Sequence, residues 1–374
     1  MRRQGVVVAL GFLVLAALGI GYKTCSRPSP PSSDALKSSD KKAVDVANAL
    51  RSKGISSAAA GSAAPEAPGT RPLSLPHGGV VFSSPWGGQS IDQVGRNRPE
   101  EGNPEGPMSL SVDGKGRVYV LDQVNARVVK HSADGKAESA FPIGSEASQD
   151  IAIASDGKVA VLDRFSSKSV SMYDDSGALI GDLPLVGGPG KNGEGEIDKP
   201  GLVTGVFVDG QDVYAEREHG PLVRIGDTSG KPAEERTEIP GRPTRDGLSY
   251  INAGIIDAQL GRAYVSSIVR ASMEHRFTRE VRMEAMIQTI LLLDSDKSGM
   301  IYLGTHVEWA PNDQVVFLIC LEPEKGTPVG TVILPVNSMP EESFRDLVVL
   351  DQGGVVYAIR SEAGVSYQHY SCDD

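Results

Sequence analysis

The sequence predicts an all-β fold, a six-bladed β-propeller, preceded by an N-terminal transmembrane helix and a disordered linker. Three observations predict the propeller. A strand–turn–strand unit recurs six times, 43 Gly and 24 Pro supply turns, and no long amphipathic helix separates the strands as a parallel α/β fold would require. The 374 residues divide into a membrane segment at 1–25, a linker at 26–75 and the propeller at 76–374.

The repeated unit is an apolar strand, a turn that usually contains Gly or Asp, and a second apolar strand. Its six copies cover 109–122, 150–163, 203–217, 251–267, 290–305 and 346–360. Their second strands are expected to begin at Val118, Val159, Val213, Ala263, Ile301 and Val356, at spacings of 41, 54, 50, 38 and 55 residues. A hairpin with two further strands needs about 40–50 residues, which is the period of a propeller blade.

The two ends of the propeller sequence predict how the ring closes. The sixth copy is followed by one more strand, GVSYQHYS, which leaves its blade one strand short of four. The segment GGVVFSSP at 78–85 precedes the first full hairpin, and we expect it to supply the missing strand. Such closure hides the strand edges that would otherwise promote aggregation.

The stretch 94–136 carries a pattern of spaced glycines and aspartates around its strands. The matching positions are Gly95, Gly102, Pro107, Asp113, Gly116, Asp122, Asn125, Arg127, Asp134 and Gly135. This stretch resembles a blade of the NHL-repeat family. Blade two keeps only Asp156, Gly157, Asp163 and Gly177, and blades four to six keep only the hairpin. The resemblance implies a six-bladed propeller used mostly for binding, although some relatives are lactonases or lyases.

Blade four departs most from the repeat, because a charge-rich insert follows its hairpin. The insert, 271–289, reads as a short helix or as two long strands. Its methionines, Met273, Met283 and Met286, would pack in the core or form an adaptable surface for a partner.

The N-terminus predicts a membrane anchor. Arg2 and Arg3 precede an uncharged run from Gly5 to Tyr22. A helix of this length spans about 27 Å, close to the hydrocarbon thickness of a bilayer. The positive charge places the N-terminus in the cytoplasm and the propeller in the periplasm or outside the cell. The alternative is a cleaved signal and a secreted protein, but Tyr22 and Lys23 do not suit a cleavage site.

Charge and cysteine content exclude several classes of function. The formal charge is -11; residues 1–75 contribute +6 from ten Lys/Arg and four Asp/Glu, which leaves -17 on the remainder. So acidic a domain does not suit nucleic acid, whose binding requires cations. The cysteines are Cys25, Cys320 and Cys372, and the lack of a CxxC pair argues against a zinc ribbon or a thioredoxin-like site. Cys320 and Cys372 either form a disulfide in an oxidising compartment or Cys320 is simply buried as an apolar residue.

Two familiar motifs occur in the sequence but lack the context that their functions require. The run Gly188 to Gly193 matches G-x-G-x-x-G, but no helix start follows it for a dinucleotide. The run Asp294 to Gly299 opens like a calcium loop, but Thr305 stands where the bidentate Glu belongs, so a hairpin turn is expected. The six histidines lack metal-ligand spacing, and no G-x-S-x-G occurs. No catalytic residue or metal ligand is therefore assigned.

One row of residues remains as a candidate site. The residues ending the six second strands are Asp122, Asp163, Arg217, Ser267, Thr305 and Arg360. If they border the central channel, Asp122, Asp163, Arg217 and Arg360 are candidates to bind a polar ligand or a carboxylate. Alternatively, they bond to neighbouring backbone and lock one blade to the next.

These observations favour a membrane-tethered, extracytoplasmic binding module or scaffold. We expect a monomer without a cofactor, attached to the membrane through residues 5–22, that binds a protein or a glycan of the cell envelope. The alternative is an enzyme of the propeller lactonase or lyase type, which would hold a divalent metal such as calcium in the central channel.

Overall fold

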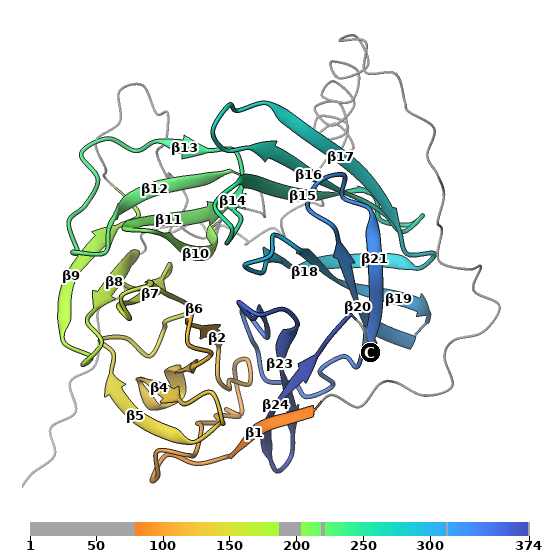
Figure 1. The fold of residues 1–374 in the computed structure, drawn as a ribbon. Helices are drawn as coiled ribbons and strands as arrows, with labels where there is room; N and C mark the ends of the chain where they lie inside the picture. Colours follow the sequence, from red (N-terminus) through yellow and green to blue (C-terminus); the bar gives the residue numbers. More distant parts are fainter. Residues whose placement is uncertain (1–78, 187–202, 218–220, 312, 373–374) are drawn as a thin grey trace, which may run out of the picture. The chain divides into compact units, whose positions relative to one another are not determined.

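The computed structural model describes residues 79–186, 203–217, 221–311 and 313–372. Within them, six four-stranded antiparallel sheets surround a common centre, so the predicted six-bladed propeller is confirmed (Figure 1). The predicted membrane segment 1–25 and linker 26–75 lie outside the described residues. No helix in the described part of the chain has the length and apolar character needed to cross a membrane.

The first three blades follow one another along the chain, each with four strands from the centre outward. Blade one contains β2 (Ser109–Val112), β3 (Val118–Asp122), β4 (Arg127–His131) and β5 (Ala137–Pro142), with a 3-10 helix η1 (Gln123–Asn125) after β3. Blade two contains β6 (Asp150–Ile153), β7 (Val159–Asp163), β8 (Ser169–Tyr173) and β9 (Leu179–Pro184). Blade three contains β10 (Val203–Asp209), β11 (Asp212–Arg217), β12 (Leu222–Asp227) and β13 (Glu238–Ile239).

The last three blades complete the ring. Blade four contains β14 (Arg242–Pro243), β15 (Ser249–Asp257), β16 (Arg262–Val269) and β17 (His275–Arg282). Blade five contains β18 (Met286–Ser295), β19 (Ile301–Ala310), β20 (Asp313–Leu321) and β21 (Pro328–Leu334). Blade six contains β22 (Leu347–Val349), β23 (Val355–Ser361), β24 (Gly364–Tyr370) and, as its outer strand, β1 (Gly79–Pro85).

Blade four requires a correction to the predicted repeat. The hairpin predicted at 251–267 is formed by β15 and β16, but the sheet order makes these the second and third strands of the blade. The first strand is β14, which has only two residues and therefore no alternation to detect. The insert 271–289 contains β17 and the start of β18, so the two-strand alternative is correct. Met283 is buried in the core, whereas Met273 is exposed.

Ring closure follows the prediction. β1 pairs antiparallel with β24, with Phe82 opposite Tyr367 and Pro85 opposite Gly364. The ring of Phe82 stacks on Tyr367 at 4.3 Å and on His131 of blade one at 4.2 Å between centroids. The closing strand therefore joins blade six to blade one through side chains as well as through the backbone.

Apolar side chains on both faces of each blade form the core between blades. All five residues of β3 are buried, as the near-continuous apolar strand predicts. Leu121 and Val128 of blade one pack in one cluster with Ile151 and Val161 of blade two. Because each sheet is covered on both faces, a single blade has little independent stability.

The antiparallel order places two kinds of chain segment at one end of the ring. Ser109 at the start of β2 pairs with Leu121 near the end of β3, so first strands begin where second strands end. We call this end of the ring the entry face. It carries the connections between blades and the turns between second and third strands.

Candidate functional site

A buried ion pair lies at the centre of the entry face. Nη2 of Arg345, in the loop before β22, is 2.5 Å from Oδ2 of Asp150 at the start of β6. The same carboxylate accepts hydrogen bonds from the Ser109 hydroxyl at 2.6 Å and the Val206 N–H at 2.9 Å. Burial raises the pKa of Asp150, and the charge of Arg345 opposes that effect.

A second buried ion pair joins blades three and four. Arg242 donates from Nε to Oε1 of Glu216 at 2.7 Å and from Nη2 to Oε2 at 2.5 Å. Its Nη1 donates to the Leu293 carbonyl of blade five, also at 2.5 Å. Burial lowers the pKa of Arg242, but the Glu216 carboxylate more than offsets this and leaves the pKa raised.

The two pairs meet at Gly205 on β10. A Cβ at this position would lie 2.9 Å from Glu216 Oε2, 3.2 Å from Arg345 Nη2 and 3.4 Å from Asp150 Oδ2. All six blades contribute to this central network, through Ser109, Asp150, Val206, Glu216, Arg242, Leu293 and Arg345. Its charges satisfy one another, so the centre of the ring is occupied by the protein's own ion pairs.

The predicted row begins with two aspartates that bond to nearby protein groups. Asp122 is fully buried and accepts hydrogen bonds from the Gly95 N–H, the Asn125 amide and Arg127 Nε, each at 2.8 Å. Asp163 accepts from the Ser145 hydroxyl at 2.7 Å and from the backbone N–H groups of 165–167. Burial raises the pKa of Asp163, but these donors outweigh it and hold the pKa below its usual value.

The remaining members of the row do not share one environment. Arg360 forms an ion pair with Asp346 at 2.8 Å and donates to the Pro107 carbonyl at 2.9 Å. Arg217 pairs with Glu238, and Thr305 is buried in the middle of β19. Ser267 belongs to the third strand of its blade, near the opposite end of the ring. Asp122, Asp163 and Arg360 therefore all have protein partners. Both interpretations of the row, ligand binding and the locking of one blade to the next, stay predictions.

Two further predictions concern blade five. Cys320 of β20 and Cys372 after β24 form a disulfide, with 6.2 Å between their Cα atoms. The run Asp294 to Gly299 ends β18 and turns toward β19, as expected for a hairpin. There Asp296 Oδ1 accepts from the Ser298 N–H at 2.8 Å. No three His, Cys, Asp or Glu side chains gather into a possible metal site within the described ranges.

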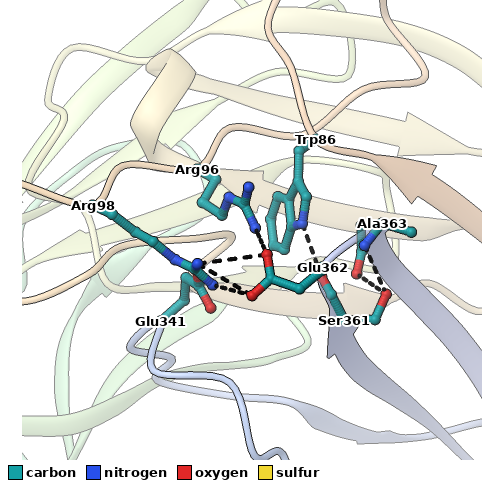
Figure 2. Close-up of polar contacts among 8 residues, drawn as sticks. Trp86, Arg96, Arg98, Glu341, Ser361, Glu362 and Ala363 are labelled. Atoms are coloured by element: carbon teal, nitrogen blue, oxygen red, sulfur yellow. Dashed lines mark hydrogen bonds and ion pairs between the residues drawn. The ribbon is translucent and has the colours of Figure 1, made fainter.

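The loop before blade one is fastened to blade six by a set of residues that we call the latch (Figure 2). The Trp86 indole N–H donates to the Ser361 carbonyl at 2.9 Å, and the Arg96 guanidinium lies 5.1 Å from the Trp86 ring centroid. Arg96 pairs with Glu362 at 2.8 Å. Arg98 pairs with the buried Glu341 at 2.6 Å and with Glu362 at 3.2 Å. The latch thus leaves both glutamates with cationic partners.

Beside the central network, the entry face holds a cleft of about 480 Å³ between blades one, two and six. Its walls include the acids Glu105, Glu146 and Glu342, the aromatic residues Phe165 and Phe344, the amides Gln123 and Gln149, and Met108 and Arg164. We call it the entry cleft. Sequence reasoning missed it, because its lining comes from inter-blade loops and from residues just beyond the second strands.

The charges of the entry cleft are less balanced than those of the central network. Arg164 donates to the Val203 carbonyl at 2.7 Å, and its guanidinium lies 4.6 Å from the Phe165 ring centroid and 4.9 Å from that of Phe344. Burial lowers its pKa.

The three cleft carboxylates contrast with the acids of the latch. Glu105, Glu146 and Glu342 form no ion pair with any residue that the structure describes. Glu342 accepts from the Asn103 amide at 2.5 Å, and Glu105 from the Asn97 amide at 3.2 Å.

Gln123 is the least expected residue of the cleft. It is the first residue of η1, directly after Asp122 at the end of β3, and it is only 1% exposed. Neither its Oε1 nor its Nε2 has a hydrogen-bond partner among the described residues. Buried amides usually have hydrogen-bond partners, so an unpaired amide beside a cleft is a group that a ligand could satisfy.

The strand pairing and the closed ring define this chain as a six-bladed β-propeller. No protein-family model matches it, so the NHL-repeat resemblance is not confirmed, and no curated protein matches its sequence significantly. Similar solved structures include hydrazine synthase of Kuenenia stuttgartiensis, with 15% identity over 71% of this chain and 76% of that one, at a TM-score of 0.45.

Two further solved structures show a comparable likeness. The RRP9 WD40 repeats have 13% identity over 74% of this chain and 97% of theirs, at a TM-score of 0.43. Virginiamycin B lyase from Staphylococcus aureus has 12% identity over 71% of this chain and 94% of its own, at a TM-score of 0.39. The likeness is weak in each case, and the six-bladed assignment rests on the strand pairing of the chain itself.

Proposed function

We propose that this protein is a membrane-tethered, extracytoplasmic binding module that presents the entry cleft to a protein of the cell envelope. One observation carries the proposal. The acids at the centre of the ring are paired with arginines, whereas the cleft beside them keeps three carboxylates without ion pairs and one buried amide without partners among the described residues. Free polar groups in a concave site are what a ligand recognises.

The distribution of perturbed groups favours binding over catalysis. The pKa values of Asp150 and Arg242 are raised, but both residues are buried within the central network and neither lines the cleft. Arg164 does line the cleft, but burial only lowers the pKa of a guanidinium that stays charged. A general acid or base must contact its substrate, whereas the described contacts of Asp150 and Arg242 are with protein groups of the central network. The NHL-like pattern of blade one also favours binding over catalysis, because propellers of the NHL-repeat family mostly bind other molecules.

The location rests on the sequence together with the disulfide. The uncharged run from Gly5 to Tyr22, preceded by two arginines, has the length and flanking charge of an anchor with a cytoplasmic N-terminus. The disulfide between Cys320 and Cys372 suits an oxidising compartment, which the periplasm or the cell exterior provides. The linker 26–75 would hold the propeller away from the headgroups.

Site-specific photo-crosslinking in membranes tests the proposal. A photoreactive phenylalanine analogue replaces Phe165, which is 57% exposed in the cleft, and in a matched control it replaces Leu179, which is 58% exposed on outer strand β9. We expect one protein to crosslink at position 165 and not at 179, with the chain in the membrane fraction. Equal capture at both positions, or no capture at 165, would overturn the proposed protein partner.

The lactonase or lyase alternative has its own readout. The enzyme would be favoured if the protein hydrolysed or cleaved members of a lactone panel, if this turnover required added calcium, and if it persisted when the cleft was blocked at Phe165. We expect no such turnover.

A further inference from the structure

We propose that the entry cleft binds an extended basic peptide. Gln123 would pair with the backbone of one peptide residue, and Glu146 and Glu342 would pair with a lysine or arginine side chain beside it. This inference rests on the proposed binding function and names the chemistry of its partner.

The Gln123 amide supplies the first argument. Leaving a buried amide unpaired is energetically costly, so a ligand that satisfies both atoms gains binding free energy. Oε1 requires a donor and Nε2 an acceptor, side by side. In an extended strand the N–H and C=O of one residue point to the same side, as antiparallel pairing shows. One extended peptide residue therefore matches both atoms of Gln123, and the amide must turn toward the cleft on binding because the residue is only 1% exposed in the structure.

The unpaired carboxylates supply the second argument. Three acids and one guanidinium line the cleft, and that guanidinium already donates to the Val203 carbonyl. Glu146 and Glu342 are exposed at the rim, so a ligand cation reaches them without first displacing a protein cation. A neutral sugar would leave these charges uncompensated, which favours a basic peptide over a glycan.

The cleft walls supply the third argument. Phe165, Phe344 and Met108 provide apolar surface beside the acids. Lysine and arginine bury their aliphatic stems on such surface while their charged ends reach a carboxylate.

The acidic rim is also held in place by the backbone. Glu105 and Glu342 form a parallel bridge, and the Glu342 N–H donates to the Pro104 carbonyl at 2.9 Å. A rim fixed before binding loses little conformational entropy when a ligand arrives.

The test uses the full chain in detergent and two peptide pools. Both are acetylated, amidated heptapeptides with random flanks; one has lysine at the centre and the other has glutamate. We expect the lysine pool to be retained at least tenfold better. The double variant Glu146→Gln/Glu342→Gln should abolish this preference, and added salt should weaken it in the parent chain.

The variant Gln123→Leu separates recognition from folding. If the amide has no partner in the free protein, leucine keeps or raises the thermal midpoint while retention of the lysine pool falls at least tenfold. Gln211→Leu, on an exposed turn between β10 and β11, is the matched control and should change neither quantity. A lower midpoint for Gln123→Leu, or unchanged retention, would overturn the role of Gln123.

The remaining outcomes distinguish this inference from the proposed function. A protein crosslinked at Phe165 together with better retention of the glutamate pool refutes the basic ligand but leaves the binding module standing. Retention of neutral oligosaccharides in place of both pools makes the cleft a glycan site and refutes the peptide ligand. If no protein crosslinks at position 165 and neither peptide pool is retained, the proposed binding module is itself refuted.

Discussion

The guanidinium of Arg345, in the loop that leads into blade six, forms a 2.5 Å ion pair with Asp150 of blade two. These blades are not neighbours, since blade one lies between them and contributes Ser109 to the same carboxylate. The pair therefore links three successive blades at the centre of the entry face. The Asp150 side chain is fully buried and the Arg345 side chain is only 16% exposed, so loss of the pair should lower the stability of the fold.

Replacing Asp150 with asparagine should be strongly destabilising. The change leaves the Arg345 charge buried without its partner, and breaking a buried pair in this way costs about 3–5 kcal/mol. The control Asp175→Asn removes the pairing of a half-exposed carboxylate with Lys130 and should cost about 1 kcal/mol or less. Urea unfolding measures both. Similar losses for the two variants would contradict the importance assigned to the central pair.

Acid should weaken the joint between blades six and one through His131. Burial lowers the pKa of this histidine to about 4, from 6.5. Because its folded pKa lies below its unfolded pKa, its contribution to stability is complete above pH 6.5 and is lost as the pH falls toward 4. The loss between pH 7.5 and pH 5 should be about 2 kcal/mol. Urea unfolding at both values measures it, and His131→Phe, which keeps the ring stack, should remove about this much of the pH dependence.

The disulfide should contribute substantially to stability under oxidising conditions. It closes a loop of 52 residues between blade five and the end of the chain. Constraining a loop of this length is worth about 4 kcal/mol in the chain-entropy model, and measured effects are usually about 2–4 kcal/mol. Cys372→Ser should lower the unfolding free energy by that amount. A reductant should produce the same loss in the parent chain and no further loss in the variant; a reductant without effect on the parent would refute the bond.

Ring closure should be sensitive to a single methyl group at Gly364. This glycine has a φ of +149°, and a Cβ there would lie 2.2 Å from the Ser84 carbonyl oxygen of the paired strand. Gly364→Ala should therefore weaken the pairing of β1 with β24, cost more than about 2 kcal/mol and expose a strand edge that promotes association. Gly79→Ala, at the open end of β1 with nothing within 4 Å, is the control. Unfolding and size-exclusion chromatography give the two readouts.

The sequence was informative wherever a strand was long enough to alternate. The second strands at Val118, Val159 and Ile301 begin where the repeat predicts, and the closing strand lies at 79–85 within the expected segment. Blade four was misaligned because β14 consists of Arg242 and Pro243 alone. Two residues carry no periodic signal, so the repeat predicts that the following hairpin contains the first strand of the blade, whereas β14 is that strand.

The candidate site was less accessible to sequence reasoning for a geometric reason. The predicted row consists of residues at the ends of second strands. The central network instead uses residues at the starts of first strands, such as Ser109 and Asp150, together with Arg345 in the loop before the first strand of blade six. The repeat already contained the first two of these positions, so aligning strand starts would have found them. Gln123 is different, because its significance depends on its having no hydrogen-bond partner among the described residues of the folded chain, which the sequence alone does not reveal.

The pairing of β1 with β24 also imposes an order on biosynthesis. The strand that closes the ring is among the first parts of the propeller to leave the ribosome, and its partner is among the last. While blades one to five are being synthesised, β1 has no neighbour in its sheet, and the stack of Phe82 between His131 and Tyr367 cannot form. Closure of the ring must therefore wait until β24 has been synthesised, so the first strand of the propeller to be made is the last to be covered.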